Sequence, residues 1–314
     1  MVAYPVAALD LTALIKNSEL IVVGRVVALR DGGELTVSVN GQSVRAHRTF
    51  GTLKVTRMLK GGGGRARIDI EFFRDEWGMI TPILIDEFGM FFLRHTGMNT
   101  YGPSDRNFPL LVALLNPPVS KVDPFDRVVS ELVNVITSTS DVASRIQAID
   151  ALNNVRNVQA RSALKRAARD AQLSVRLSAV ASLVRQNDKA SVDTAIEILL
   201  GSSQRYDQTL FNKLKVAIRA VNDPALATDL SRLLEAPDTT TRRAATYALR
   251  QMRTSAASKS LSKALNDSDR EVRYQAVIGL AEITSDYQWG PALEIYLKDE
   301  NLYLKHWKDW SKNR

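Results

Sequence analysis

The stretch Asp238-Thr-Thr-Thr-Arg242-Arg-Ala-Ala245 decides the fold, because Asp269-Arg-Glu-Val-Arg273-Tyr-Gln-Ala276 repeats its key residues 31 residues later. Each stretch has Arg four residues after the opening Asp and Ala three residues after that Arg. Looser copies open at Asp141, Gln172 and Asp207, so that consecutive copies are 31, 35, 31 and 31 residues apart. Such a period is typical of a repeat protein, in which each unit packs mainly on its neighbours.

The repeated segment has the apolar spacing of a helix with one buried face. In each copy an apolar residue is followed four residues later by Leu or Ile, on the same helical face. The pairs are Ala148 and Leu152, Ala179 and Leu183, Leu214 and Ile218, Ala245 and Leu249, and Ala276 and Leu280. Because alanine lets helices approach closely and leucine fills the space beside it, we expect the alanines at buried helix crossings.

The charged residues of the repeat predict a structural role. The opening Asp is expected to accept hydrogen bonds from the N–H groups of the first helical turn. The Arg four residues later is expected to reach the Asp of an adjacent repeat, which would form a ladder along the stack. The residues of this predicted ladder are Asp141, Arg145, Arg176, Asp238, Arg242, Asp269 and Arg273.

Second helices are expected between the repeated ones, at 160–170, 191–200, 224–234, 256–265 and 291–297. The third repeat departs from the pattern, since Phe211 replaces Arg and Leu214 replaces Ala, and either a wider helix crossing or an altered local curvature is expected there. A sixth unit has Trp307 at the alanine position and is expected to cap the stack.

This pattern resembles HEAT repeats of the short, phycobilisome-lyase-like kind over residues 141–314. The resemblance implies an α-solenoid whose concave surface is lined by the second helix of each pair. On that basis the candidate partner-binding residues are Arg166, Glu197, Arg232, Lys263 and Glu294. Two of these five are acidic, whereas a cradle for DNA needs cations throughout.

The N-terminal part predicts a small β-domain. A short helix is expected at 11–16, and β-branched, apolar strands are expected at 19–29, 34–39, 43–50, 51–59, 66–73, 80–85 and 90–94. Asn40-Gly41 predicts a hairpin turn, and Gly61–Gly64 is interpreted as a hairpin turn instead of a phosphate loop. Many short antiparallel strands are typical of a barrel or sandwich.

The segments Ser18–Val26, Leu53–Gly61 and Gly89–Leu93 resemble the OB-like barrels related to netrin and metalloproteinase-inhibitor domains. The N-terminal cysteine through which those inhibitors act is absent here, so inhibition does not carry over. Bacterial relatives of this type are usually exported. This leaves open a periplasmic or exported location with a signal peptide ahead of this sequence, and the compartment stays undetermined.

The predicted fold class is therefore α+β multidomain, with a small antiparallel β-barrel followed by an all-α HEAT-type solenoid. The expected domains are the barrel at 1–100, a linker and capping helix at 101–135, and about six helical units at 136–314. The chain has no cysteine, and its histidines, His47, His95 and His306, lie far apart in sequence. No catalytic residue, metal site or cofactor is predicted from these residues.

The function predicted from sequence is a non-enzymatic scaffold that binds a protein or peptide on the concave face of the solenoid. The net charge of +8 suits an anionic partner but is modest for 314 residues. Two alternatives stay open, a nucleic-acid-binding protein resembling HEAT-like DNA glycosylases and a chromophore-lyase-like enzyme. The pairs Asp75-Glu76 and Asp86-Glu87 are either cation ligands or acidic turns at strand ends.

Overall fold

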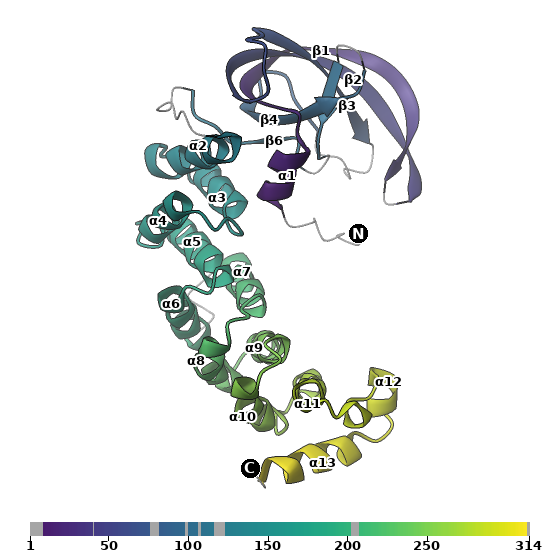
Figure 1. The fold of residues 1–314 in the computed structure, drawn as a ribbon, viewed down its shortest axis with the longest axis vertical. Coiled ribbons are helices and arrows are strands. Elements are labelled where there is room, and N and C mark those ends of the chain that lie inside the picture. The colour runs from purple at the N-terminus through teal and green to yellow at the C-terminus, as the bar shows by residue number, and fades with distance from the viewer. Residues whose placement is uncertain are drawn as a thin grey trace. The chain divides into compact units, whose positions relative to one another are not determined.

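The computed structural model describes residues 9–39, 41–75, 82–97, 100–105, 108–115, 123–201 and 207–312. The chain divides into two compact units, Met1–Ala163 and Leu164–Arg314. Unit 1 contains a β-sheet with helices before and after it, and unit 2 is helical (Figure 1).

Unit 1 begins with α1 (Leu11–Asn17), whose first turn is capped by Asp10. The strands that follow are β1 (Leu20–Val39), β2 (Gln42–Lys60), β3 (Arg67–Asp75), β4 (Phe88–His95), β5 (Thr100–Pro103) and β6 (Leu110–Leu111). Their order in the sheet is β1-β2-β3-β5-β4-β6, and β1 also pairs with β4. All pairs are antiparallel except β3 with β5. Following the strand pairs from β1 through β2, β3 and β5 to β4 therefore leads back to β1.

The hairpin predicted around Asn40-Gly41 is confirmed, since Val39 pairs with Gln42 and Gly41 has φ +80°. The strands expected separately at 19–29 and 34–39 form one continuous strand, β1. Its register against β2 shifts at four places, one of them between Asp31 and Glu34. Such bulges bend a strand without ending it, and the polar residues that break the sequence pattern are accommodated there.

The sheet differs from the sequence expectation near residues 80 and 100. The strand predicted at 80–85 is wrong for its described part, because 82–84 are irregular and 85–86 form a turn. Ile83 is nevertheless fully buried in the core beside Phe91, so its apolar character reflects packing and not strand pairing. The sheet continues through β5 and β6, so the expected domain boundary after residue 100 falls within β5.

Three helices follow the sheet, namely α2 (Pro124–Ser138), α3 (Val142–Ala151) and α4 (Val158–Ala167), and α4 crosses the boundary between the units. Within unit 1, Arg57 of β2 binds Glu131 of α2 through two hydrogen bonds of 2.7 and 2.6 Å. The same guanidinium donates to the carbonyls of Leu114 and Leu115, at 2.6 and 2.9 Å. The Glu131 side chain is only 6% exposed, so this pair is a buried link between sheet and helix.

Unit 2 contains two rows of helices. The first row is the repeated helix of the sequence pattern, α5 (Leu173–Arg185), α7 (Gln208–Arg219), α9 (Thr239–Gln251) and α11 (Arg270–Thr284). The second row is α6 (Lys189–Leu200), the segment η2 (Pro224–Leu226), α8 (Ala227–Ser231) and η3 (Arg232–Glu235), and α10 (Ser255–Ala264). The unit ends with η4 (Tyr287–Trp289), α12 (Leu293–Tyr296) and α13 (Glu300–Lys312).

The first-row helices meet through small residues, as predicted. Ala148 of unit 1 and Ala179, Ala245 and Ala276 of unit 2 are completely buried. Three residues after Ala276, a Cβ on Gly279 would lie 2.8 Å from a methyl of Leu261 and 3.3 Å from Cβ of Arg250. Only the absence of a side chain allows α11 to approach its neighbours this closely.

The row that lies inside the bend of unit 2 is the opposite of the one expected. In Figure 1, α7, α9 and α11 follow the inner side of the curve and α6, α8 and α10 follow its outer side. The residues at the helix crossings contribute to this arrangement, because the small side chains Ala179, Ala245 and Ala276 are buried where first-row helices pack closely.

The C-terminal unit has the aromatic packing expected of a cap. Trp307 is completely buried and donates from its indole N–H to the carbonyl of Trp289 at 3.0 Å. Trp310 packs edge-on against Trp307, with ring centroids 5.5 Å apart. The indole of Trp307 thus packs in the core of unit 2 and ties α13 to η4.

Candidate interaction surface

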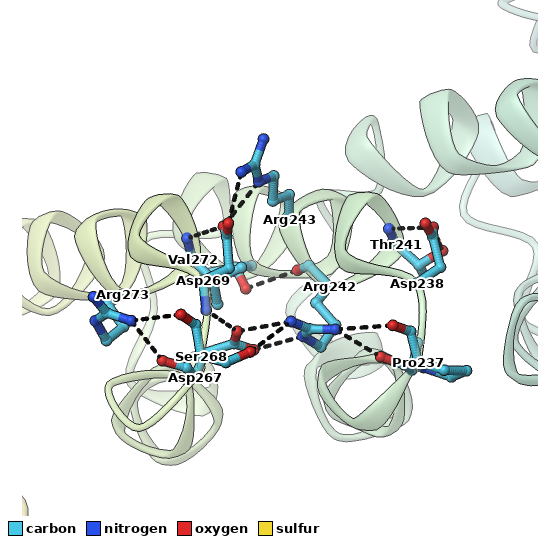
Figure 2. Close-up of polar contacts among 12 residues, drawn as sticks. Pro237, Asp238, Thr241, Arg242, Arg243, Asp267, Ser268, Asp269, Val272 and Arg273 are labelled. Atoms are coloured by element: carbon cyan, nitrogen blue, oxygen red, sulfur yellow. Dashed lines mark hydrogen bonds and ion pairs between the residues drawn. The ribbon is translucent and has the colours of Figure 1, made fainter.

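The opening Asp caps its own helix in the four repeats that have one, as predicted, whereas Gln172 makes no side-chain cap. The carboxylate of Asp141 accepts from the backbone N–H of Ser144 at 2.8 Å, and Asp269 accepts from that of Val272 at 3.1 Å. Asp238 accepts from the N–H of Thr241 at 2.8 Å (Figure 2). Burial raises the pKa of Asp238, but hydrogen bonds from Thr241 and Thr240 outweigh it and lower the pKa to about 2.

The Arg four residues after the cap fastens the preceding loop. Arg242 donates to the carbonyls of Ala236 and Pro237 at 3.0 and 3.2 Å. Arg273 repeats this with the carbonyls of Asp267 and Ser268, at 2.8 and 2.9 Å. The remaining two arginines of the predicted ladder also bind carbonyls, Arg176 those of Asp170 and Ala171, and Arg145 that of Ile136. This role uses carbonyls left open at the loop and was not predicted from sequence.

The expected contact of this Arg with the capping Asp of the next repeat is wrong. Arg242 reaches Asp267 instead, through two hydrogen bonds of 2.8 and 3.0 Å. Its neighbour Arg243 binds the capping residue Asp269, at 2.8 and 2.6 Å (Figure 2). Adjacent arginines leave a helix in different directions, so one helix engages two carboxylates of the following loop.

Further carboxylates continue this pairing along the first row. Arg250 binds Glu282 at 2.6 and 3.2 Å and donates to Gln275 at 2.7 Å. Arg270 and Arg273 both bind Glu300 of α13. The hydrogen bond from Arg273 lowers the pKa of Glu300, which keeps this carboxylate charged. Arginine–carboxylate pairs thus join α9 to α11 and α11 to α13.

The five residues predicted to bind a partner lie on or beside the second row, and all five are exposed. Glu197 and Arg232 form an ion pair with each other, and Lys263 pairs with Glu235. The alternation of charge seen in the sequence therefore serves contacts between neighbouring segments of the outer row. Exposed pairs of this kind contribute little to stability, about 0–1 kcal/mol. Arg166 on α4 and Glu294 on α12 are not part of these pairs.

The first row has a strongly basic composition that sequence reasoning missed, because only the second row was compared. Its cations are Arg176, Arg185, Lys213, Lys215, Arg219, Arg242, Arg243, Arg250, Arg270 and Arg273, and its carboxylates are Glu271 and Glu282. Most of these cations are engaged within unit 2. For example, Lys215 lies 3.3 Å from the carboxylate of Asp238 and donates to Thr240 at 2.7 Å.

Arg219 differs from the other first-row arginines. Its guanidinium lies over the ring of Tyr247, 4.1 Å from the ring centroid, and so joins α7 to α9. In the part of the chain that the structure describes, it has no ion pair and donates no hydrogen bond. Val216, three residues earlier on the same helical face, is 51% exposed. These three residues combine a cation, an aromatic ring and an aliphatic group at the solvent.

Of the two acidic pairs singled out in the sequence, Asp86-Glu87 lies in the described residues and makes hydrogen bonds that stabilise a turn. At the turn after Ile83, the Glu87 carboxylate accepts from the N–H of Leu84 at 2.8 Å, and the Asp86 carbonyl accepts from Arg25 at 2.6 Å. Glu76 and the side chain of Asp75 lie outside the described residues, so that acidic pair stays a prediction. Across the described ranges, no three His, Cys, Asp or Glu side chains are grouped to hold a metal ion.

Unit 1 has a surface cavity of about 310 Å³ beside the β1–β2 hairpin, lined by Leu29, Arg30, Asp31, His47 and Thr49. His47 lies 3.8 Å from Glu34 across the two strands, and the guanidinium of Arg30 lies over the ring of Phe50. Among the helices described, none is long and apolar enough to cross a membrane.

Comparison with known families bears on the central part of unit 2. Residues 216–281, which include α9, α10 and most of α11, match the family model of HEAT repeats. This part of unit 2 is therefore similar to HEAT repeats, in a chain whose helices repeat as a solenoid. Neither the likeness to phycobilisome-lyase repeats nor the OB-like likeness of unit 1 is tested by this match, and both stay predictions.

Two solved structures are similar to the chain at low sequence identity. A designed armadillo repeat protein is 15% identical, with 51% of this chain and 83% of that chain covered and a TM-score of 0.33. Human deoxyhypusine hydroxylase in complex with glycerol is 19% identical, with 60% and 73% covered and a TM-score of 0.28. Comparison with curated proteins finds no match. The likeness to HEAT repeats therefore rests on the family match of residues 216–281.

Proposed function

We propose that unit 2 is a scaffold that binds a protein or peptide partner on the face formed by α7, α9 and α11. The observation that carries this proposal is the pairing of first-row arginines with carboxylates from one repeat to the next. It makes a surface of mixed charge whose side chains are held in fixed positions. Such surfaces favour specific recognition of a complementary protein over general attraction to any anion.

Selection of short random peptides by display on the immobilised full-length chain tests this proposal. The affinity of a selected peptide is then measured for Val216→Glu and for the control Ile295→Glu. Val216 on α7 and Ile295 on α12 are 51% and 52% exposed, so the two changes are matched in exposure. We expect Val216→Glu to weaken binding by about tenfold or more and the control to leave it unchanged. Equal affinities of both variants would contradict the proposal.

The nucleic-acid alternative is tested with a DNA duplex of about 20 base pairs at about 150 mM salt and about 1 μM protein. Because Arg242, Arg243 and Arg250 are paired with carboxylates, they release few counterions from DNA. We expect no measurable complex. A sub-micromolar dissociation constant with a steep dependence on salt would favour the alternative.

We also propose that the sheet of unit 1 is an OB-like barrel. Five strands that pair in the order β1-β2-β3-β5-β4 and return to β1 support a small closed barrel. Since the chain has no cysteine, a disulfide between Arg25→Cys and Phe88→Cys tests the closing pair of β1 with β4. The control combines Phe88→Cys with Lys54→Cys, because Lys54 pairs with Arg25 on β2. Only the first combination is expected to oxidise to a disulfide.

A further inference from the structure

The exposed group Arg219, Tyr247 and Val216 indicates what chemistry the partner has. A guanidinium lying over an aromatic ring keeps the N–H groups at its edge free to donate. The two N–H groups along one edge match the spacing of two carboxylate oxygens. The Arg219 guanidinium thus has an ordered position and unused donors at the surface.

The surroundings of Arg219 distinguish a carboxylate from a phosphate backbone. On α9, Arg243 and Arg250 are bound to Asp269 and Glu282, and on α7, Lys215 is bound to Asp238. A nucleic acid gains affinity by neutralising several phosphates in a row, which requires several unpaired cations. A single cation beside an apolar side chain suits a short peptide with an acidic and an apolar residue.

We propose that Arg219, held over Tyr247, anchors an acidic peptide segment of the partner. One carboxylate of the segment accepts two hydrogen bonds from Arg219, and an apolar side chain of the segment contacts Val216. This inference rests on the proposed function of unit 2 and specifies its site and the class of its partner. Charge complementarity determines the occupant, because the site offers one cation whose charge no carboxylate of the described residues offsets.

The test uses parallel selections of random peptides on the full-length chain and on Arg219→Ala. We expect Asp and Glu to be enriched among peptides selected on the natural chain and not among those selected on the variant. A synthetic peptide from the first selection should bind Arg219→Ala about tenfold or more weakly. Arg219→Lys should also bind more weakly, since an ammonium lacks the planar fork.

Lys259→Ala is the matched control, because it removes an exposed cation from α10 in the second row. Its affinity for the same peptide should stay within about twofold of the natural chain. The unfolding midpoint of Lys259→Ala, measured in denaturant, is expected to coincide with that of the natural chain because this residue is exposed, and the midpoint of Arg219→Ala is expected to be only slightly lower because the contact with Tyr247 is lost.

The outcomes separate this inference from the function on which it rests. Peptides that bind without acidic enrichment, weaken with Val216→Glu and ignore Arg219→Ala would overturn the inference and leave the scaffold proposal intact. Peptides whose binding ignores Val216→Glu and Arg219→Ala alike would overturn both. A DNA duplex bound at about 150 mM salt and lost in Arg219→Ala would replace the acidic peptide with a phosphate ligand.

Discussion

Both units contain a bidentate arginine–carboxylate pair, but the two partners are separated by very different numbers of residues in the sequence. In unit 1, Arg57 binds Glu131, 74 residues away, and joins a strand to a helix. In unit 2, Arg242 binds Asp267, 25 residues away, and joins a helix to the next loop. Both pairs are bidentate and largely buried, with side-chain exposures of 17% and 6% in unit 1 and 11% and 6% in unit 2.

The two units differ in how many polar side chains connect neighbouring elements. In unit 2, Arg243 and Arg250 also pair with carboxylates between α9 and α11, and Arg270 and Arg273 both pair with Glu300 of α13, so these two junctions have more than one connection. In unit 1, the Arg57 guanidinium that binds Glu131 also donates to the carbonyls of Leu114 and Leu115. A repeat distributes polar contacts along the stack, whereas in unit 1 the single guanidinium of Arg57 makes four hydrogen bonds, to Glu131 and to the carbonyls of Leu114 and Leu115.

The largest effect is expected from Glu131→Ala in unit 1. The change leaves the Arg57 guanidinium buried without its carboxylate, which typically costs about 3–5 kcal/mol of unfolding free energy. Denaturant unfolding of the full chain measures this loss. The double variant Arg57→Met with Glu131→Leu should recover much of it, since no unpaired charge remains. A Glu131→Ala variant as stable as the natural chain would show that the Arg57–Glu131 pair contributes little to the free energy of unfolding.

Leu249→Ala is expected to be the next in size. Leu249 is completely buried in the first row, and truncation of such a leucine costs about 2–5 kcal/mol. Because each repeat leans on its neighbours, the loss should also separate the unfolding of α5–α7 from that of α11–α13. Hydrogen exchange resolved along the chain would detect this separation. Uniform protection throughout unit 2 would argue against it.

Asp238→Ala is expected to cost about 0.5–2 kcal/mol, because the cap of α9 is lost. The carboxylate has a folded-state pKa of about 2, below its ordinary value of 3.8. Its contribution is therefore complete above pH 3.8 and is lost as the pH falls through about 2. Unfolding free energies of both chains across this range should converge on acidification. A difference that grows in acid would contradict the assignment.

The smallest effect is expected from Arg243→Ala. This side chain is 48% exposed, and exposed ion pairs contribute about 0.2–1 kcal/mol. Arg242→Ala, one residue away, removes a largely buried partner of Asp267 and should be clearly more destabilising. Thermal unfolding of the two variants in parallel makes the comparison. Equal losses would mean that burial does not distinguish these adjacent arginines.

The sequence predicted the parts of this molecule that depend on local periodicity. Buried Ala245 and Ala276, the caps at Asp238 and Asp269, and the hairpin at Gly41 each follow from residues close together in the chain. The row that faces inward was not predictable in the same way. It depends on the relative spacing of two rows of helices, which results from the packing of both.

Contacts between distant residues were also missed. Nothing in the sequence near Arg57 indicates that its partner is Glu131, because neither residue belongs to a repeated motif. Arg219 and Tyr247 occupy positions in consecutive repeats that are not equivalent, so aligning the repeats does not bring them together. A comparison of first-row positions would have shown the basic composition of that row, and this signal was available.

The pairing of Arg242 with Asp267 makes residues 238–268 a self-contained cassette, because both partners belong to the same 31-residue stretch. A duplicated cassette inserted after Ser268 would bring its own pair and its own capping Asp for the preceding Arg243. The copy would differ at two positions that meet the preceding repeat, since Gln251 would stand at the position of Glu282, the partner of Arg250, and Ala248 at the position of Gly279, which packs against Leu261 and Arg250. With Gln251→Glu and Ala248→Gly in the copy, we expect the solenoid to accept one more repeat, which makes its length an adjustable property of the protein.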